Sequence, residues 1–262
     1  MASSNKQPVT GWQRDLAIRL QKLTYGFSRR WLLYFNLFFA IYAGLPILAP
    51  VLMNAGLTGP AGLIYTAYGP MCHQMASRSF FLFGEQYAYP RELAGTDLVP
   101  FETYMPNIPE FEGISDNPAE WSEFLFAARS FLGNEQLGYK TAVCERDIAI
   151  YGFVFLGGLA YALARRRWNV QPLPLFVFIV LGMGPIGLDG FSQLFSQFAT
   201  TPLFVWMQDA FPLRESTPFL RTFTGAVFGF SLAFLVYPHI AEGMKDTERR
   251  LHAKLSRIGE LP

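Results

Sequence analysis

Long apolar segments alternate with polar ones along this chain, and four of them are long enough to cross a membrane as helices. A helix needs roughly 20 predominantly apolar residues to span about 30 Å of hydrocarbon. The fourth segment also has a strong start signal, because Thr217 can cap the helix and Pro218 suits its first turn. The pattern therefore predicts an all-α integral membrane protein with four transmembrane helices. These helices are expected at residues 31–53, 148–164, 173–194 and 218–237.

The stretch before the first span has a different character. In residues 11–28, Leu16, Leu20, Leu23 and Phe27 recur at helical spacing between lysines and arginines. That spacing indicates an amphipathic helix with a basic face. Both a helix lying on the membrane surface and an ordinary cytosolic helix fit this pattern.

Other apolar stretches are too short or too interrupted to span. Residues 57–70 contain glycines and prolines, so we expect a re-entrant or interfacial segment there. Residues 76–83 predict a short turn of apolar helix that ends at Gly84. Residues 195–211 include proline and aspartate and are expected at the interface, while residues 242–257 predict a mixed-charge helical tail.

Between the first and second spans lies a long polar insertion. It is acidic and rich in proline and glycine, yet it holds many aromatic residues, which argues for a folded cap rather than a disordered loop. A short helix is expected at residues 118–132, with Asn117 as its cap. The chain then divides into a basic cytoplasmic or interfacial arm (1–30), the first transmembrane helix and re-entrant segment (31–84), the extracytoplasmic insertion (85–142), a three-helix transmembrane core (143–240) and a cytoplasmic tail (241–262).

Composition and charge agree with this division. The chain of 262 residues is 51% hydrophobic with a net charge of +1, which suits a small polytopic membrane protein and gives no indication of nucleic-acid binding. With four spans, the basic arm, the arginines at 165–167 and the basic tail all fall on one side. The positive-inside rule assigns that side to the cytoplasm. We therefore expect a plasma-membrane protein with both termini inside and the insertion outside.

The candidate metal ligands flank the insertion. Cys72 and His73 precede it, while Cys144 and Asp147 follow it, three residues apart at the start of the second span. Two thiolates, an imidazole and a carboxylate suit a tetrahedral site for zinc or another divalent transition metal. On the oxidising side of a membrane, a Cys72–Cys144 disulfide that staples the insertion is the open alternative.

Charged residues near the outer ends of the spans suggest chemistry beside this site. The candidate acid or base residues are Asp189 and Glu145, either of which could also complete a metal site, as could water. The candidate substrate-binding residues, suited to an anionic group, are Arg78, Arg214, Arg221 and Gln193. A carboxylate at the depth of Asp189 usually has a partner, so we expect an arginine beside it, most simply Arg214 or Arg221. Ion pairing alone, without any substrate, also explains these arginines.

Small residues recur at helix-packing spacing in the fourth span. Gly225 and Gly229 form a small-xxx-small pattern, which permits close approach of two helices. We expect this pattern to serve packing within the bundle rather than a homodimer.

Several motifs together resemble a family of uncharacterised polytopic prokaryotic membrane proteins, known only as a domain of unknown function. The resemblance covers roughly residues 69–238 without the insertion. In many members the segment corresponding to 144–147 reads Cys-x-x-Cys, which implies a metal site, and here Asp147 stands in place of the second cysteine. The matching motifs are Cys72-His73-Gln74 with Arg78-Ser79-Phe80-Phe81, Cys144-x-Arg146-Asp147, Asp189-Gly190-x-x-Gln193, and Arg214-Glu215-Ser216 with Arg221-x-x-Thr224-Gly225.

Two functions follow from the sequence. The first is a metal-dependent membrane enzyme that acts on an anionic, lipid-like substrate at the outer interface. The second is a non-catalytic accessory subunit of a larger membrane complex, with the insertion (85–142) as the surface for a membrane-protein partner and the cysteines as a disulfide. A thiol redox role is less favoured, because the chain has no Cys-x-x-Cys. Membrane lipid is the expected partner in either case.

Overall fold

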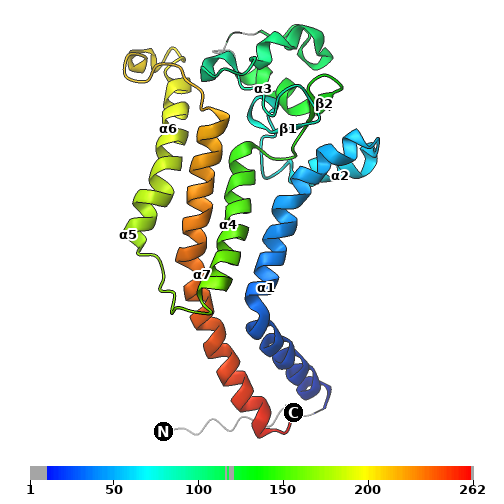
Figure 1. Ribbon diagram of the computed structural model, residues 1–262, viewed down its shortest axis with the longest axis vertical. Helices are drawn as coiled ribbons and strands as arrows, with labels where there is room; N and C mark the ends of the chain where they lie inside the picture. Colours follow the sequence, from blue (N-terminus) through cyan, green and yellow to red (C-terminus); the bar gives the residue numbers. More distant parts are fainter. Residues whose placement is uncertain (1–10, 116, 118–120, 261–262) are drawn as a thin grey trace.

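The computed structural model describes residues 11–115, 117 and 121–260 and is dominated by four long helices (Figure 1). All four are long and apolar enough to cross a membrane. The prediction of an all-α membrane protein is therefore confirmed. The four are α1 (Trp12–Asn54), α4 (Glu145–Ala164), a third span made of α5 (Leu175–Val177), a π-helix (Phe178–Met183) and α6 (Gly184–Phe198), and α7 (Pro218–Arg257).

The first and last helices extend well beyond the apolar segments. The amphipathic arm and the first span form one continuous helix of 43 residues, and the fourth span continues into the tail as one helix of 40 residues. The start of α1 and the end of α7 lie side by side at the end of the molecule away from the cap (Figure 1). Salt bridges Lys22–Glu260 at 2.7 Å and Arg29–Glu248 at 3.6 Å join them.

Helices α4 and α7 pack against each other at unusually close range. A Cβ placed on Gly225 would lie 2.6 Å from the Arg146 carbonyl oxygen, and one on Gly229 would lie 2.2 Å from that of Ile150. Only glycine permits this approach, so the small-xxx-small pattern serves packing within the bundle, as predicted. The start of α7 is also as predicted, because the Thr217 hydroxyl accepts a hydrogen bond from the Leu220 amide at 3.1 Å.

A π-helix interrupts the third span at Phe178–Met183. It ends just before Pro185, which lacks the amide hydrogen needed for the usual i→i−4 bond and whose ring would crowd the carbonyl of Leu181. A wider helical turn upstream removes that conflict. Gly182 lies in the widened segment, and a Cβ there would be 2.6 Å from the Ser231 hydroxyl of α7. The third span therefore approaches α7 at this level.

The insertion folds into a cap with its own hydrophobic core of aromatic and aliphatic side chains. It contains α3 (Trp121–Ser130) and a three-stranded antiparallel sheet in the order β1-β3-β2. The strands are β1 (Phe81–Leu82), β2 (Gly133–Asn134) and β3 (Gly138–Lys140). Short 3-10 turns connect the rest of the cap, at Glu92–Ala94, Phe101–Thr103, Met105–Asn107 and Pro109–Phe111. Of the helix predicted at 118–132, residues 118–120 lie outside the described residues.

One predicted helix is wrong. Residues 76–83 form a helical turn only at Ala76–Arg78, and the chain then becomes strand β1, whose Phe81 pairs with Lys140. Gly84 comes so close to the returning chain that a Cβ on it would lie 1.9 Å from the Leu137 carbonyl oxygen. Pairing with a distant strand therefore decides the local structure here. A further 3-10 turn lies at Val205–Met207, in the loop after α6.

Helix α2 (Thr58–Tyr68) and the ends of the insertion form the join between bundle and cap. Helix α2 leans away from the bundle beside the cap (Figure 1). The Gln74 side-chain amide donates to the carbonyls of Tyr65 at 2.8 Å and Ala142 at 2.7 Å. The buried Lys140 ammonium donates to the Gln74 carbonyl at 2.6 Å and to the carbonyls of two residues near the end of α3. These bonds hold the two ends of the insertion side by side.

Candidate metal centre and arginine cavity

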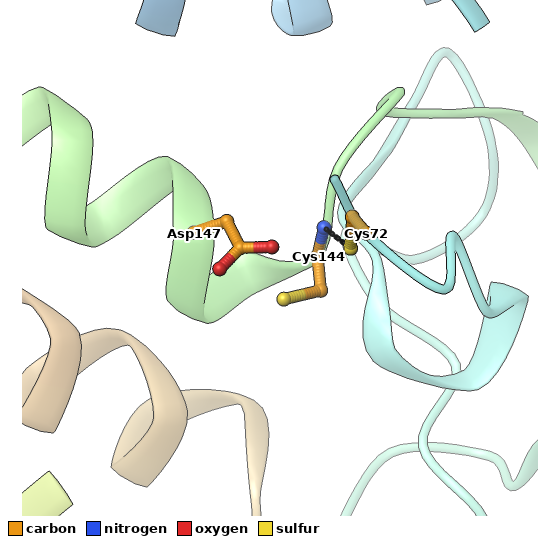
Figure 2. Close-up of side chains that lie close together, drawn as sticks. All are labelled: Cys72, Cys144 and Asp147. Carbon is orange, nitrogen blue, oxygen red and sulfur yellow. Dashed lines mark hydrogen bonds between the residues drawn. The ribbon is translucent and has the colours of Figure 1, made fainter. Parts of the chain in front are cut away.

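Two cysteines and an aspartate meet where α4 begins. Cys144 is the residue before the first turn of α4, Asp147 lies within that turn, and Cys72 comes from the loop after α2. The ligand atoms of these three residues all lie within 4.8 Å of one another. Figure 2 shows the three side chains turned toward a common space, with the Cys144 amide donating to the Cys72 Sγ at 3.3 Å. We call these residues the metal-ligand cluster.

The two sulfurs are chemically unequal. Both cysteines are free thiols. A hydrogen bond from the Cys144 thiol lowers the pKa of Cys72, although burial and the charge of Asp147 oppose it. The same bond, together with burial, raises the pKa of Cys144 well above its usual range. Cys72 is therefore the first to become a thiolate, which is the form that binds metal ions.

His73 takes no part in this cluster. Its side chain is exposed, and among the described residues the cluster includes only Cys72, Cys144 and Asp147. The structure thus brings together three of the four predicted ligands. The next residue, Gln74, has a positive φ of 54° and points its amide inward, so the chain turns sharply at this point.

A buried ion-pair network lies beside the cluster. Arg221 donates to Glu145 at 3.3 Å, to Glu215 at 2.8 Å and to the backbone carbonyl of Ser77 at 3.3 Å. Glu215 also accepts from Arg78 at 2.8 Å. Burial acts to raise the pKa of Glu215, but the two arginines outweigh it and hold that pKa below its usual range. Glu145 supplies only one oxygen to the network, because its buried Oε1 has no hydrogen-bond partner among the described residues.

Asp189 belongs to a second group of ion pairs. It binds Arg214 at 3.2 Å, which confirms the predicted arginine partner, and it also binds Arg146. Gln193, one turn further along α6, donates to the Asp189 carbonyl at 3.0 Å and accepts from the Ser216 amide at 3.1 Å. Asp189 therefore fixes arginines from two other segments, which explains how its charge is tolerated near the end of a span.

A cavity of about 430 Å³ lies between these groups, and we call it the arginine cavity. Cys144 lies in its wall and also belongs to the metal-ligand cluster. Of the predicted substrate-binding residues, Arg78, Arg221 and Gln193 line it and Arg214 does not. Its lining is Arg78, Cys144, Arg146, Gly190, Gln193, Leu194, Gln197, Phe198 and Arg221.

Two polar residues of this wall were not singled out as binding residues from the sequence. Arg146 lies between Cys144 and Asp147, and Gln197 follows Gln193 by one helical turn. For Gln197 the spacing was a usable signal, because residues four apart on a helix share a face. The candidate acid or base residues Asp189 and Glu145 are not part of the wall, and both are held by arginines.

Comparison with known proteins agrees with these motifs. Residues 127–235 match an uncharacterised family, Predicted membrane protein (DUF2085). The predicted resemblance to an uncharacterised membrane-protein family is thereby confirmed. The DUF2085 match includes Cys144 and Asp147 of the metal-ligand cluster, whereas Cys72 lies before it.

A relative of this chain is likewise without an assigned function. The uncharacterized protein MJ1492 of Methanocaldococcus jannaschii is 23% identical over 175 residues, which is 67% of either chain. No solved structure matches this chain. The comparisons therefore support a membrane protein and leave its activity to be inferred from the site.

Proposed function

We propose that this protein is a metal-dependent membrane enzyme that acts on an anionic, lipid-like substrate at the end of the bundle that carries the cap. One observation carries the proposal. The metal-ligand cluster, with its ligand atoms within 4.8 Å of one another, shares Cys144 with the arginine cavity. A soft-ligand metal site and an anion site therefore adjoin.

The residues of the cluster suit zinc or another divalent transition metal. Cys72, Cys144 and Asp147 supply three ligand atoms of the types that zinc binds. Three protein ligands leave one position open, as in catalytic rather than structural zinc sites. A metal ion bound there would act as a Lewis acid toward a substrate oxygen or a water molecule.

The charge of the surroundings favours an anionic substrate. The ion-pair network and the Asp189 group together contain four guanidinium groups (Arg78, Arg146, Arg214, Arg221) and three carboxyl groups (Glu145, Asp189, Glu215), so they hold one more guanidinium than carboxyl group. Three of the arginines line the cavity. Their planar guanidinium groups suit phosphate or carboxylate oxygens.

The two acids have different roles in this proposal. Asp189 holds Arg146 and Arg214 in place, so it is a positioning residue. Glu145 directly follows Cys144 and has a buried oxygen without a hydrogen-bond partner among the described residues. That oxygen is the better candidate to hold a proton during a reaction.

The orientation in the membrane is also part of the proposal. Residues 11–30 and 241–260 lie at the end of the molecule away from the cap, and the exposed arginines at 165–167 follow the end of α4 that points away from the cap. The positive-inside rule then places both termini in the cytoplasm and the cap outside the plasma membrane.

Elemental analysis of the purified protein, with a free-thiol count on the same sample, tests the proposal. We expect one transition-metal ion per chain, lost in Cys144→Ala and Asp147→Ala because each variant lacks a ligand. His73→Ala is the matched control and should keep the metal, because His73 lies outside the cluster. A metal-free protein without free thiols would instead support the accessory subunit with a Cys72–Cys144 disulfide.

A further inference from the structure

A second cavity lies deeper in the bundle, and we call it the tail cavity. Its volume is about 620 Å³, and its wall is almost entirely apolar. It is bounded by α4, by the π-helical part of the third span and by α7. Phe153, Leu181 and Phe230 line it, one from each of these helices. Among the described residues of its wall, the polar side chains are Gln171 and Ser231.

The tail cavity is aligned with the arginine cavity. Arg146 lines the arginine cavity and Phe153 lines the tail cavity, and the two are seven residues apart on α4. Seven residues are about two turns, so both side chains lie on one face of the helix, roughly 10 Å apart along it. The third span and α7 bound both cavities as well. A charged cavity near the membrane surface is thus followed by an apolar cavity at hydrocarbon depth.

The tail cavity is accessible from the side. Phe223 and Leu181 line it, and about half of each side chain is exposed on the surface that faces lipid. The π-helix shapes this wall, since its widened turn carries Leu181 and brings Gly182 against Ser231. π-Helical segments cost stability relative to an α-helix and occur frequently at functional sites.

We propose that the tail cavity holds a hydrocarbon chain of the same molecule whose anionic group is bound in the arginine cavity, so that the ligand is an anionic membrane lipid. This inference rests on the proposed function for the anionic end. A chain that leaves the bilayer for this cavity exchanges one apolar environment for another, so the hydrophobic effect contributes little. The arginines supply the affinity, and the cavity selects for the presence and shape of the chain.

The test uses the full protein in phosphatidylcholine nanodiscs. The probe is phosphatidic acid with a photoreactive diazirine near the end of one acyl chain, and the crosslinked peptides are identified by mass spectrometry. We expect crosslinks to residues 173–181 and 223–234. Val227→Trp fills the cavity and should reduce them about tenfold. Leu188→Trp is the matched control, because Leu188 is exposed on α6 and lines neither cavity, and it should leave the crosslinks unchanged.

Several results would overturn the inference. Crosslinks scattered over the exposed face of α1 would show that the chain has no fixed site. Equal labelling by the phosphatidylcholine analogue would show that the arginines do not anchor the ligand. Inorganic phosphate that competes as strongly as unlabelled phosphatidic acid would make free phosphate the ligand. If Val227→Trp does not fold, the crosslink positions in the unmodified protein still decide the question.

The outcome also separates this inference from the proposed function. The predicted crosslinks in a protein that purifies without metal would keep the lipid site and remove the metal-dependent activity. A metal-loaded protein with scattered crosslinks would keep the metal-dependent activity and remove the lipid site. Metal content of Val227→Trp should equal that of the unmodified protein, because Val227 lines the tail cavity and belongs neither to the metal-ligand cluster nor to the wall of the arginine cavity.

Discussion

Replacing Arg221 with methionine should destabilise the protein more than any other single change in the ion-pair network. Among the described residues, Arg221 forms ion pairs with two carboxylates of the network at once, and its own side chain is 3% exposed. In Arg221→Met, Glu215 keeps Arg78, whereas Glu145 has no other ion pair among the described residues. The Glu145 carboxyl group would then remain buried without a cation.

The expected cost follows from this geometry. Removing one partner of a buried ion pair typically costs about 3–5 kcal/mol, because the remaining charge stays desolvated. For a chain of this size, each kcal/mol shifts the midpoint of thermal unfolding by about 2–4 °C. The midpoint of Arg221→Met should therefore fall by roughly 6–20 °C.

The assay is thermal unfolding in detergent at two pH values. In the unmodified protein the folded state lowers the pKa of Glu215. The Glu215 carboxylate therefore stabilises the folded protein at pH values above its unfolded pKa of about 4.3. This contribution to stability is lost as the pH falls through the folded pKa. Arg221→Met lacks one of the two cations that lower that pKa. The difference between the two proteins should thus be largest at pH 7.5 and should narrow at pH 4.

Arg214→Met is the matched control. Arg214 is 38% exposed, and its partner Asp189 keeps Arg146, so the midpoint should fall by far less. The reasoning is refuted if Arg221→Met unfolds within about 2 °C of the unmodified protein, or if the difference widens on acidification.

Two further predictions concern helix packing and orientation. Gly229→Ala should lower the unfolding midpoint, because its Cβ would meet the Ile150 carbonyl oxygen. Gly243→Ala, in the open part of α7, should maintain or raise the midpoint. Equal effects of the two substitutions would contradict the close packing of α4 and α7. An impermeant thiol reagent should label Glu112→Cys in intact cells and Arg166→Cys only after permeabilisation, and the reverse order would overturn the proposed orientation.

The helices were largely predictable from the sequence because hydrophobic length is a direct signal. The second span was expected at 148–164 and is Glu145–Ala164, and the third was expected at 173–194 and ends at Phe198. The cap sheet was not predictable. Its strands are two or three residues long, too short for an alternating pattern to appear, and β1 is fixed by pairing with residues almost sixty positions away.

The site was predictable in part for similar reasons. Cys144 and Asp147 share one turn at a helix start, and the insertion had to return near Cys72, so their approach followed from spacing. The position of His73 could not be predicted from spacing. The chain direction at this point depends on its neighbour Gln74, whose side-chain amide is held by the carbonyls of Tyr65 and Ala142. Which arginine binds which carboxylate also depends on tertiary packing, which the sequence does not reveal.

The order of synthesis gives the ion-pair network a consequence for assembly. Cys72 and Cys144 are 72 residues apart, so at about 5–20 residues per second the first thiol waits roughly 4–14 s for the second. The ion pairs Arg78–Glu215 and Glu145–Arg221 form later still, because Glu215 and Arg221 are synthesised just before and within the last helix. A nascent chain that lacks this helix leaves Glu145 without Arg221 and exposes the face of α4, including Gly157, against which α7 should pack. Without α7 the bundle cannot form its close helix packing or complete the ion-pair network. A truncated protein should therefore be degraded by membrane proteases rather than persist as a stable shorter form.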